Sequence, residues 1–169
     1  MKRFVSIITA LLALNACAFD SEQWLEKREM FSREAERLQA AYSNCVVRVR
    51  EPAENVVLPI ETFEDGSVKT MVQAAKAMYF LEEGLVWGEG VAVIKRDRDG
   101  EIVARVDAQS CVIDRSTKSG WAQGPASVTH GKTKFSGEDV YFSSPEGYVM
   151  VMRNSEIVSE DLKFGGIKP

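Results

Sequence analysis

The sequence predicts a mainly β protein, an elongated open β-jellyroll or β-solenoid of stacked antiparallel strands, preceded by one N-terminal α-helix. Three observations support this prediction. Part of the chain repeats itself, each copy carries turn dipeptides followed by strand-like alternation, and a stretch near the N-terminus has helical spacing without glycine or proline.

The repeat runs from residue 60 to residue 127. Compared with itself at an offset of 34 residues, the chain matches without a gap. The identical pairs are Ile60 and Ile94, Asp65-Gly66 and Asp99-Gly100, Val72 and Val106, Ala74 and Ala108, Trp87 and Trp121, Gly90 and Gly124, and Ala92 and Ala126. Such a repeat indicates a supersecondary unit stacked on its own copy. A third, shortened copy is expected between Gly131 and Phe142.

The residues inside each copy identify it as β-structure. Asp-Gly is a strong turn signal, and the chain after it alternates apolar and polar residues with period two. In the second copy, Ile102, Ala104, Val106 and Ala108 therefore share one face of a strand. Each copy is expected to hold two or three strands, and stacked copies would form a continuous apolar strip inside the sheet.

Residues 19–44 are expected to form an amphipathic helix, starting with Ser21 as N-cap and Glu22 in the first turn. Its apolar residues follow roughly heptad spacing: Trp24, Phe31, Ala35, Leu38 and Tyr42. We interpret this helix as packing against the open end of the β-structure, where it would hide an unpaired edge. A short coiled-coil contact or docking to a membrane partner is the alternative.

Residues 1–18 have the pattern of a targeting segment, with Lys2 and Arg3 before an apolar stretch and small residues after it. The mature protein is therefore expected outside the cytoplasm. Cleavage after Ala18, lipidation of Cys17 and retention as an uncleaved anchor are the alternatives. Leu14-Asn15-Ala16-Cys17 resembles a bacterial lipobox, and the apolar stretch is shorter than the ~20 residues that span a bilayer comfortably.

The remaining chain divides into a linker at 45–55, with a possible strand over 45–50, a β-domain at 56–164 and a tail at 165–169. Ser144 to Gly147 is expected to form a hairpin turn, with two further short strands over 157–158 and 162–164. The last strands would leave an unpaired edge that another β-protein can extend. The candidate partner-edge residues are Tyr148, Val149, Val151, Ile157 and Leu162.

Charge and cysteine content exclude some functions. The formal net charge is −4, and it becomes −6 when Lys2 and Arg3 are removed with the targeting segment, so a nucleic-acid partner is not expected. Cys45 and Cys111 allow one disulfide in an oxidising compartment, although a buried free thiol at Cys111 explains the residue equally simply.

The sequence shows little catalytic chemistry. It contains one histidine, His130, which we expect as an exposed turn residue, so His-based metal clusters are excluded. Trp87 and Trp121 are typical of interior packing, with sugar stacking as the alternative. We predict no enzyme activity, no cofactor and no metal.

The run from Asp65-Gly66 through Ala74 to Phe80, then Trp87 to Val91, then Asp99 to Ile102 and Ala108, resembles the LptC family. This family shares its fold with the LptA/OstA domains of lipopolysaccharide export. The resemblance covers residues 56–164 and implies a β-jellyroll in the periplasm. There it would take lipopolysaccharide from inner-membrane ABC transporter subunits, hold the acyl chains inside, and pass them edge to edge to a periplasmic LptA-like protein.

This chain differs from the family in its tether. Members of this type have a membrane-spanning helix directly before the β-domain, whereas this chain has a lipobox-like segment and a charged helix. A lipid on Cys17 would replace the helix and tether the protein to the inner membrane.

An apolar strip that holds alkyl chains needs no catalysis, because burial alone contributes about 0.8 kcal/mol per methylene. The candidate lipid-binding residues are Val68, Val72, Ala74, Val91, Val93, Ile102, Val106, Ala108 and Phe135. The same strip would also serve as an ordinary packed core. A structural or protein-interaction lipoprotein that uses its β-edge and carries no lipid is therefore the alternative function.

Overall fold

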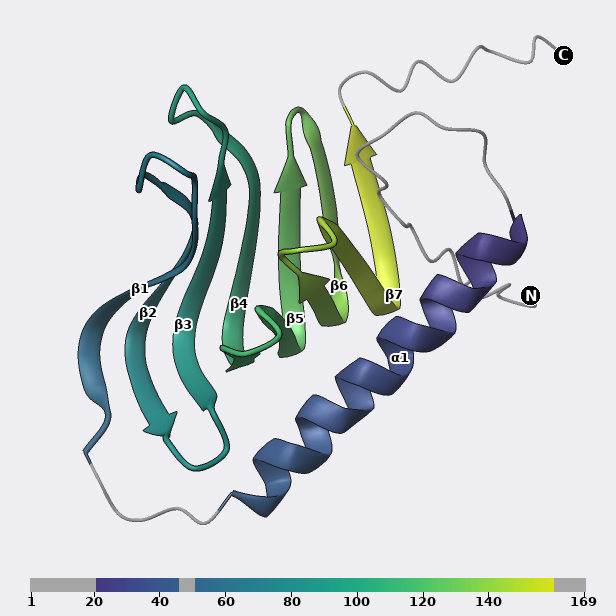
Figure 1. The fold of residues 1–169 in the computed structure, drawn as a ribbon. Coiled ribbons are helices and arrows are strands. Elements are labelled where there is room, and N and C mark those ends of the chain that lie inside the picture. Colours follow the sequence, from purple (N-terminus) through teal and green to yellow (C-terminus); the bar gives the residue numbers. More distant parts are fainter. Residues whose placement is uncertain (1–20, 46–50, 160–169) are drawn as a thin grey trace, which may run out of the picture.

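The computed structural model describes residues 21–45 and 51–159, which form one helix and one open antiparallel sheet of seven strands (Figure 1). The strands pair with their neighbours in chain order, so the sheet is a simple meander. The elements are α1 (Ser21–Asn44), β1 (Ala53–Thr62), β2 (Val68–Phe80), β3 (Leu85–Arg96), β4 (Ile102–Asp114), β5 (Ser119–His130), β6 (Thr133–Ser143) and β7 (Tyr148–Ser159). The predicted mainly β fold with a single preceding helix is confirmed.

The repeat corresponds to pairs of strands. Asp65-Gly66 and Asp99-Gly100 lie in the β1–β2 and β3–β4 turns, where both glycines have positive φ. The Asp65 carboxylate accepts hydrogen bonds from the Ser67 amide and hydroxyl, which stabilises this turn. The β2–β3 and β4–β5 pairs are thus equivalent units, and β6 lies where the shortened third copy was expected.

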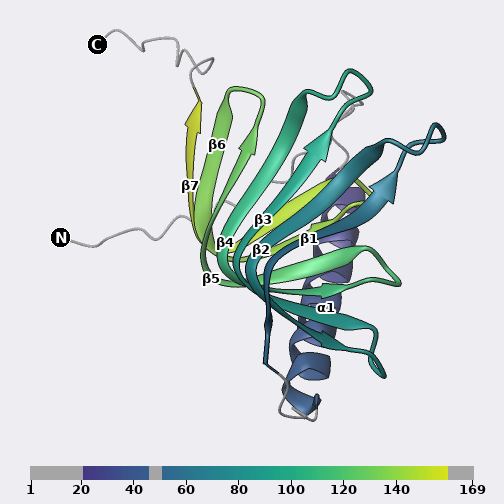
Figure 2. The ribbon, with the colours of Figure 1, turned by 90° about the vertical axis from the view of Figure 1, so that its left-hand side faces the viewer.

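A line of residues with positive φ crosses the sheet near the middle of the strands. It consists of Asn55, Gly90, Gly124, Asp139 and Asn154, and we call it the crease. Strand register places Asn55 and Gly90 on either side of one β2 position, and the Asp139 carboxylate accepts a hydrogen bond from the Gly124 amide. Residues with positive φ interrupt the regular extended conformation, so the strands bend here and the sheet folds over (Figure 2).

The crease divides the sheet into two arms. The free arm comprises residues 56–62, 68–74, 91–96, 102–108, 126–130, 133–137 and 155–159. The helix arm comprises residues 76–80, 85–89, 110–114, 119–123, 139–143 and 148–152. The inner faces of the two arms turn towards each other, and their apolar side chains form one buried cluster, which we call the interior.

Helix α1 lies on the outer face of the helix arm, along β4 to β7 (Figures 1 and 2). Its residues Phe31, Ala35 and Leu38 form a second buried cluster with side chains of that face, including Trp121 and Tyr141. The rings of Phe31 and Tyr141 stack with centroids 5.3 Å apart. The predicted helix is confirmed, but its predicted place is wrong, because it covers a face of the sheet rather than an edge.

An ion pair adds to this contact. Arg37 of α1 donates a 2.9 Å hydrogen bond to the carboxylate of Asp114 at the end of β4. Burial alone would raise the pKa of Asp114, but hydrogen bonds from Ser116 and Arg37 outweigh it and lower that pKa. The helix is therefore fixed to the sheet by both apolar burial and charge.

Several predicted boundaries differ from the structure. The β-domain begins with β1 at Ala53 rather than at residue 56, and residues 157–158 belong to the long strand β7 instead of forming a separate strand. The predicted turn from Ser144 to Gly147 does join β6 to β7. The targeting segment with Cys17, most of the possible strand at 45–50, and Leu162 with the tail lie outside the described residues.

The two described cysteines are both free thiols. Cys111 is part of the interior, whereas Cys45 packs against the helix cluster on the opposite face of the sheet. A disulfide between them is therefore not formed. Burial raises the pKa of the Cys111 thiol well above its ordinary value, as expected for an inert buried side chain.

Candidate functional site

The interior is the largest apolar region of the described chain, and it draws side chains from both arms. Buried residues of β2 to β7 form it, and Val56, Leu58 and Ile60 of β1 pack against it while remaining partly exposed. Valine and alanine predominate among these residues. Corresponding positions of successive strands thus line one continuous apolar strip, as the repeat predicts.

Most of the predicted lipid-binding residues come together in this interior. Six of them are buried there: Val72, Ala74, Val91, Val93, Val106 and Phe135. Ala108 is partly buried against the same cluster. Val68 is half-buried at the start of β2, and Ile102, at the start of β4, is 48% exposed. The inner face of β4 is therefore buried at Val106 but not at Ile102, the first residue of the strand.

The side chains of the interior are closely packed. None of its buried side chains is more than 8% exposed, so the arms touch through their own valine, alanine and phenylalanine side chains. The partly exposed residues of the apolar strip within the described chain are Val56, Leu58 and Ile60 at the β1 edge, Ala108 on β4 and Val149 on β7. An acyl chain would have to separate the arms to enter.

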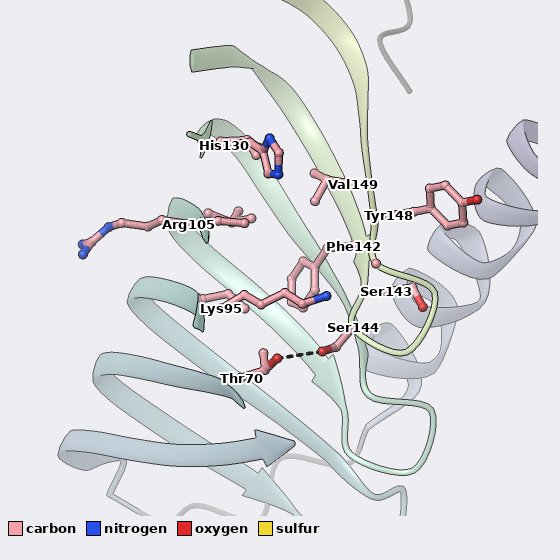
Figure 3. Close-up of a pocket in the computed structure, with 14 residues that line it drawn as sticks. Thr70, Lys95, Arg105, His130, Phe142, Ser143, Ser144, Tyr148 and Val149 are labelled. Carbon is pink, nitrogen blue, oxygen red and sulfur yellow. Dashed lines mark hydrogen bonds between the residues drawn. The ribbon is translucent and has the colours of Figure 1, made fainter. Parts of the chain in front are cut away.

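A small cavity lies where the arms part (Figure 3). Its volume is about 60 Å³, and its wall is mostly apolar. Val93, Val106 and Val128 contribute from the free arm, and Phe142 and Val149 from the helix arm. We call it the mouth cavity. Two of the predicted lipid-binding residues, Val93 and Val106, therefore line a space that is already open.

Lys95 extends into the mouth cavity from β3 (Figure 3). Among the described residues it has no ion-pair or hydrogen-bond partner. Burial lowers its pKa, and the nearby positive charge of Lys69 lowers it further, while Glu61 acts in the opposite direction. Sequence reasoning missed Lys95, although it continues the alternation of Val91 and Val93 on the inner face.

A polar cluster beside the cavity links the arms. The hydroxyls of Thr70 in β2 and Ser144 in the β6–β7 turn are 2.9 Å apart, and Ser144 donates a 2.7 Å hydrogen bond to Glu61 in β1. Lys69 forms an ion pair with the same carboxylate at 3.4 Å. We call these four residues the latch. Thr70 and Ser144 are both buried, so the contact holds the β6–β7 turn against the free arm.

The Glu61 carboxylate is the charged centre of the latch. Burial alone would raise its pKa, but the hydrogen bond from Ser144 and the charge of Lys69 outweigh burial and lower the pKa below its ordinary value. The charged form is thus the one that the folded protein stabilises.

The predicted partner-edge residues have different surroundings. β7 is one edge of the described sheet, and β1, which the sequence did not single out, is the other. Val149 and Val151 face the interior, whereas Tyr148 packs beneath α1 beside Phe31 and Lys27. Ile157 is 38% exposed on the free arm, which makes it the most exposed of the described candidates.

The remaining candidate residues, His130, Trp87 and Trp121, lie within or against the sheet. The prediction of His130 as an exposed turn residue is wrong, because it ends β5, is half-buried and points into the mouth cavity (Figure 3). Trp121 is buried under α1 and Trp87 packs against the same cluster, so both serve packing. Within the described ranges no group of three or more His, Cys, Asp or Glu side chains is arranged to hold a metal ion.

Comparisons with known proteins leave the family open. A scan against protein-family models gave no match, and a search of curated proteins gave none. The helix of the described chain is too polar to cross a membrane.

Proposed function

We propose that the protein is a non-enzymatic carrier for lipopolysaccharide in the periplasm, tethered to the inner membrane. It would take the lipid from ABC transporter subunits and pass it to a periplasmic LptA-like protein, as the resemblance to the LptC family implies. The observation that supports this proposal best is the continuous apolar interior between two arms, which reaches solvent at the β1 edge.

The energetics of the interior are compatible with reversible loading. Ten buried methylenes would contribute on the order of 8 kcal/mol before the costs of displacing protein contacts and ordering the chain. The contacts to be displaced are those of small side chains such as Val72, Ala74 and Val106, each with little surface to lose. Loading then exchanges one set of apolar contacts for another, and no chemical step is needed.

The test is photo-crosslinking in cells. A photoreactive amino acid at Leu58 or Val106 faces the interior, and one at Lys134, on the exposed outer face of the same arm, is the matched control. We expect lipopolysaccharide to be captured at the two interior positions and not at Lys134. Capture of protein alone, or of nothing, at both interior positions would contradict the carrier function.

The packed interior favours a second candidate. If its side chains are simply the protein's core, the free edges β1 and β7 become the functional parts, and the protein is an envelope interaction module without lipid cargo. The same experiment separates the two, because a photoreactive group at Ile157 on β7 would then capture a protein partner while Leu58 and Val106 capture no lipid.

A further inference from the structure

The mouth cavity combines two features that an ordinary core avoids. Its wall is mostly apolar, yet the Lys95 side chain extends into it without an ion-pair partner among the described residues. Glu61 is the acid whose charge acts on Lys95, and it already binds Lys69 and Ser144 in the latch. A partly buried cation that lacks a counter-ion is unfavourable unless something else supplies the negative charge.

We propose that the mouth cavity is a subsite for the anionic headgroup of an amphiphile, in which Lys95 binds a phosphate or carboxylate and the attached alkyl chain runs past Val93 and Val106 into the interior. This inference deepens the proposed function and rests on it, because the headgroup belongs to the same lipid whose chains the interior holds.

The geometry of the site fits such a ligand. Lys95 and His130 come from neighbouring parts of the free arm and both point into the cavity, whereas Arg105 points away from it and binds Asp107 (Figure 3). The cavity therefore presents two nitrogen groups that can donate hydrogen bonds to an anion. On its other side Val93 and Val106 are shared with the interior, so an alkyl chain passes from the cavity to the strip without crossing polar surface.

The charges near the cavity also support the binding of an anionic headgroup. Lys69 lies close enough to lower the pKa of Lys95, so the edge of the cavity carries two lysines against the single carboxylate of Glu61. An anion bound there would neutralise the excess positive charge and remove the penalty that now acts on the Lys95 ammonium.

The experiment compares two detergents of equal chain length, decyl phosphate and uncharged decyl glucoside, below their micelle concentrations by isothermal titration calorimetry. We expect the protein to bind decyl phosphate about tenfold more tightly, the contribution of one charge-assisted contact. Lys95→Met should abolish this preference while leaving decyl glucoside binding unchanged, and Lys95→Arg should retain it. Lys134→Met, which removes an exposed lysine from the outer face of the same arm, should change neither affinity.

The outcomes separate the inference from the proposed function. If Lys95→Met binds both detergents as the unaltered protein does, the headgroup subsite is wrong while an apolar carrier survives. If inorganic phosphate alone binds as tightly as decyl phosphate, the site takes a free anion and the lipid subsite is likewise wrong. If neither detergent binds to any of the proteins, both the subsite and the carrier function are contradicted.

Discussion

The two arms of the sheet share the same strands but differ in how they are stabilised. In the helix arm the strands beneath α1 are buried on both faces, as the consecutive buried residues Val140, Tyr141 and Phe142 show. In the free arm burial alternates along β5, where Ala126 and Val128 are buried and Ser127 between them is only half-buried. Strand β3 is the exception in this arm, because its residues from Val91 to Ile94 are all buried. A strand covered on both faces is held by two sets of contacts, and a strand covered on one face by a single set.

This difference assigns the arms separate roles. The helix arm, fixed to α1 by the cluster around Phe31 and Leu38, is the rigid part. The free arm is held by the interior and the latch, so we expect it to be the part that moves if a ligand enters as proposed. Opening would bend the sheet further at the crease and leave the helix contact intact.

The largest effect is expected where the helix arm is anchored. Phe31 is 1% exposed and stacks on Tyr141, so Phe31→Ala should lower the free energy of unfolding by about 3–5 kcal/mol. Urea denaturation followed by circular dichroism measures this. Leu25→Ala, at a helix position that is 50% exposed, is the control and should change stability by less than about 0.5 kcal/mol. Equal losses in the two variants would mean that α1 is not the anchor.

Substitutions at two glycines separate the cost of a steric clash from the cost of backbone strain. A Cβ at Gly120, on the inner face of the helix arm, would collide with the Phe142 ring, so Gly120→Ala should destabilise by about 1–3 kcal/mol. At Gly124 in the crease, φ is 72° and a Cβ meets no atom within 4 Å, so Gly124→Ala should cost only about 1 kcal/mol of backbone strain. The measurement is the same denaturation curve, and a larger loss at Gly124 would contradict this ranking.

The latch should contribute less than the helix contact. Ser144→Ala removes the hydroxyl that binds both Thr70 and Glu61, which should cost about 1–2 kcal/mol. Thr70 and Glu61 would keep their own 3.3 Å hydrogen bond, and Glu61 its ion pair with Lys69. Hydrogen exchange should show faster opening of β2 in this variant and unchanged protection of α1. Uniform loss of protection in both elements would mean that the arms do not open separately.

The latch also predicts that the stability of the protein depends on pH. Because the folded protein lowers the pKa of Glu61, its contribution to stability is present above the pKa of the unfolded chain, about 4.3, and is lost as pH falls through the lower folded value. Glu61→Gln should therefore reduce stability at neutral pH and flatten the fall in stability below about pH 4. Parallel pH profiles for the two proteins, measured by urea denaturation, would contradict this assignment.

The smallest effect concerns Lys95. Without a ligand its ammonium is partly buried and unpaired within the described chain, so Lys95→Met should raise stability slightly, by less than about 1 kcal/mol. A thermal melt detects this shift, and Lys134→Met is the control, with no change expected. A loss of stability in Lys95→Met would mean that the lysine has a structural role in the free protein.

The sequence predicted the parts of this fold that depend on local pattern. The Asp-Gly turns and the bounds of the helix follow from residues close together in the chain, and the equivalence of Gly90 and Gly124 follows from the repeat. The place of the helix did not follow, since the buried face of Val112 and Tyr141 that receives it becomes visible only when distant strands pair. Consecutive buried residues such as Val140, Tyr141 and Phe142 were the available signal for a strand covered on both faces.

The candidate site was predicted less completely for a related reason. Alternation along β2 and β3 correctly grouped Val72, Ala74, Val91 and Val93, because period two fixes which residues share a face. It could not show that Ser144 from a distant turn would meet Thr70, a contact between residues 74 positions apart in the chain. Sites that form where a sheet folds onto itself depend on such long-range contacts.

The central claim is that the arms must separate for the interior to receive a lipid, and a reversible lock across the latch tests it most directly. The Thr70 and Ser144 hydroxyl oxygens lie 2.9 Å apart, so Thr70→Cys with Ser144→Cys, in a Cys45→Ala background, places two thiols within bonding reach. We predict that the oxidised protein, carrying a photoreactive group at Leu58, captures no lipopolysaccharide, and that reduction with dithiothreitol restores capture. Equal capture by the oxidised and reduced proteins would contradict the account.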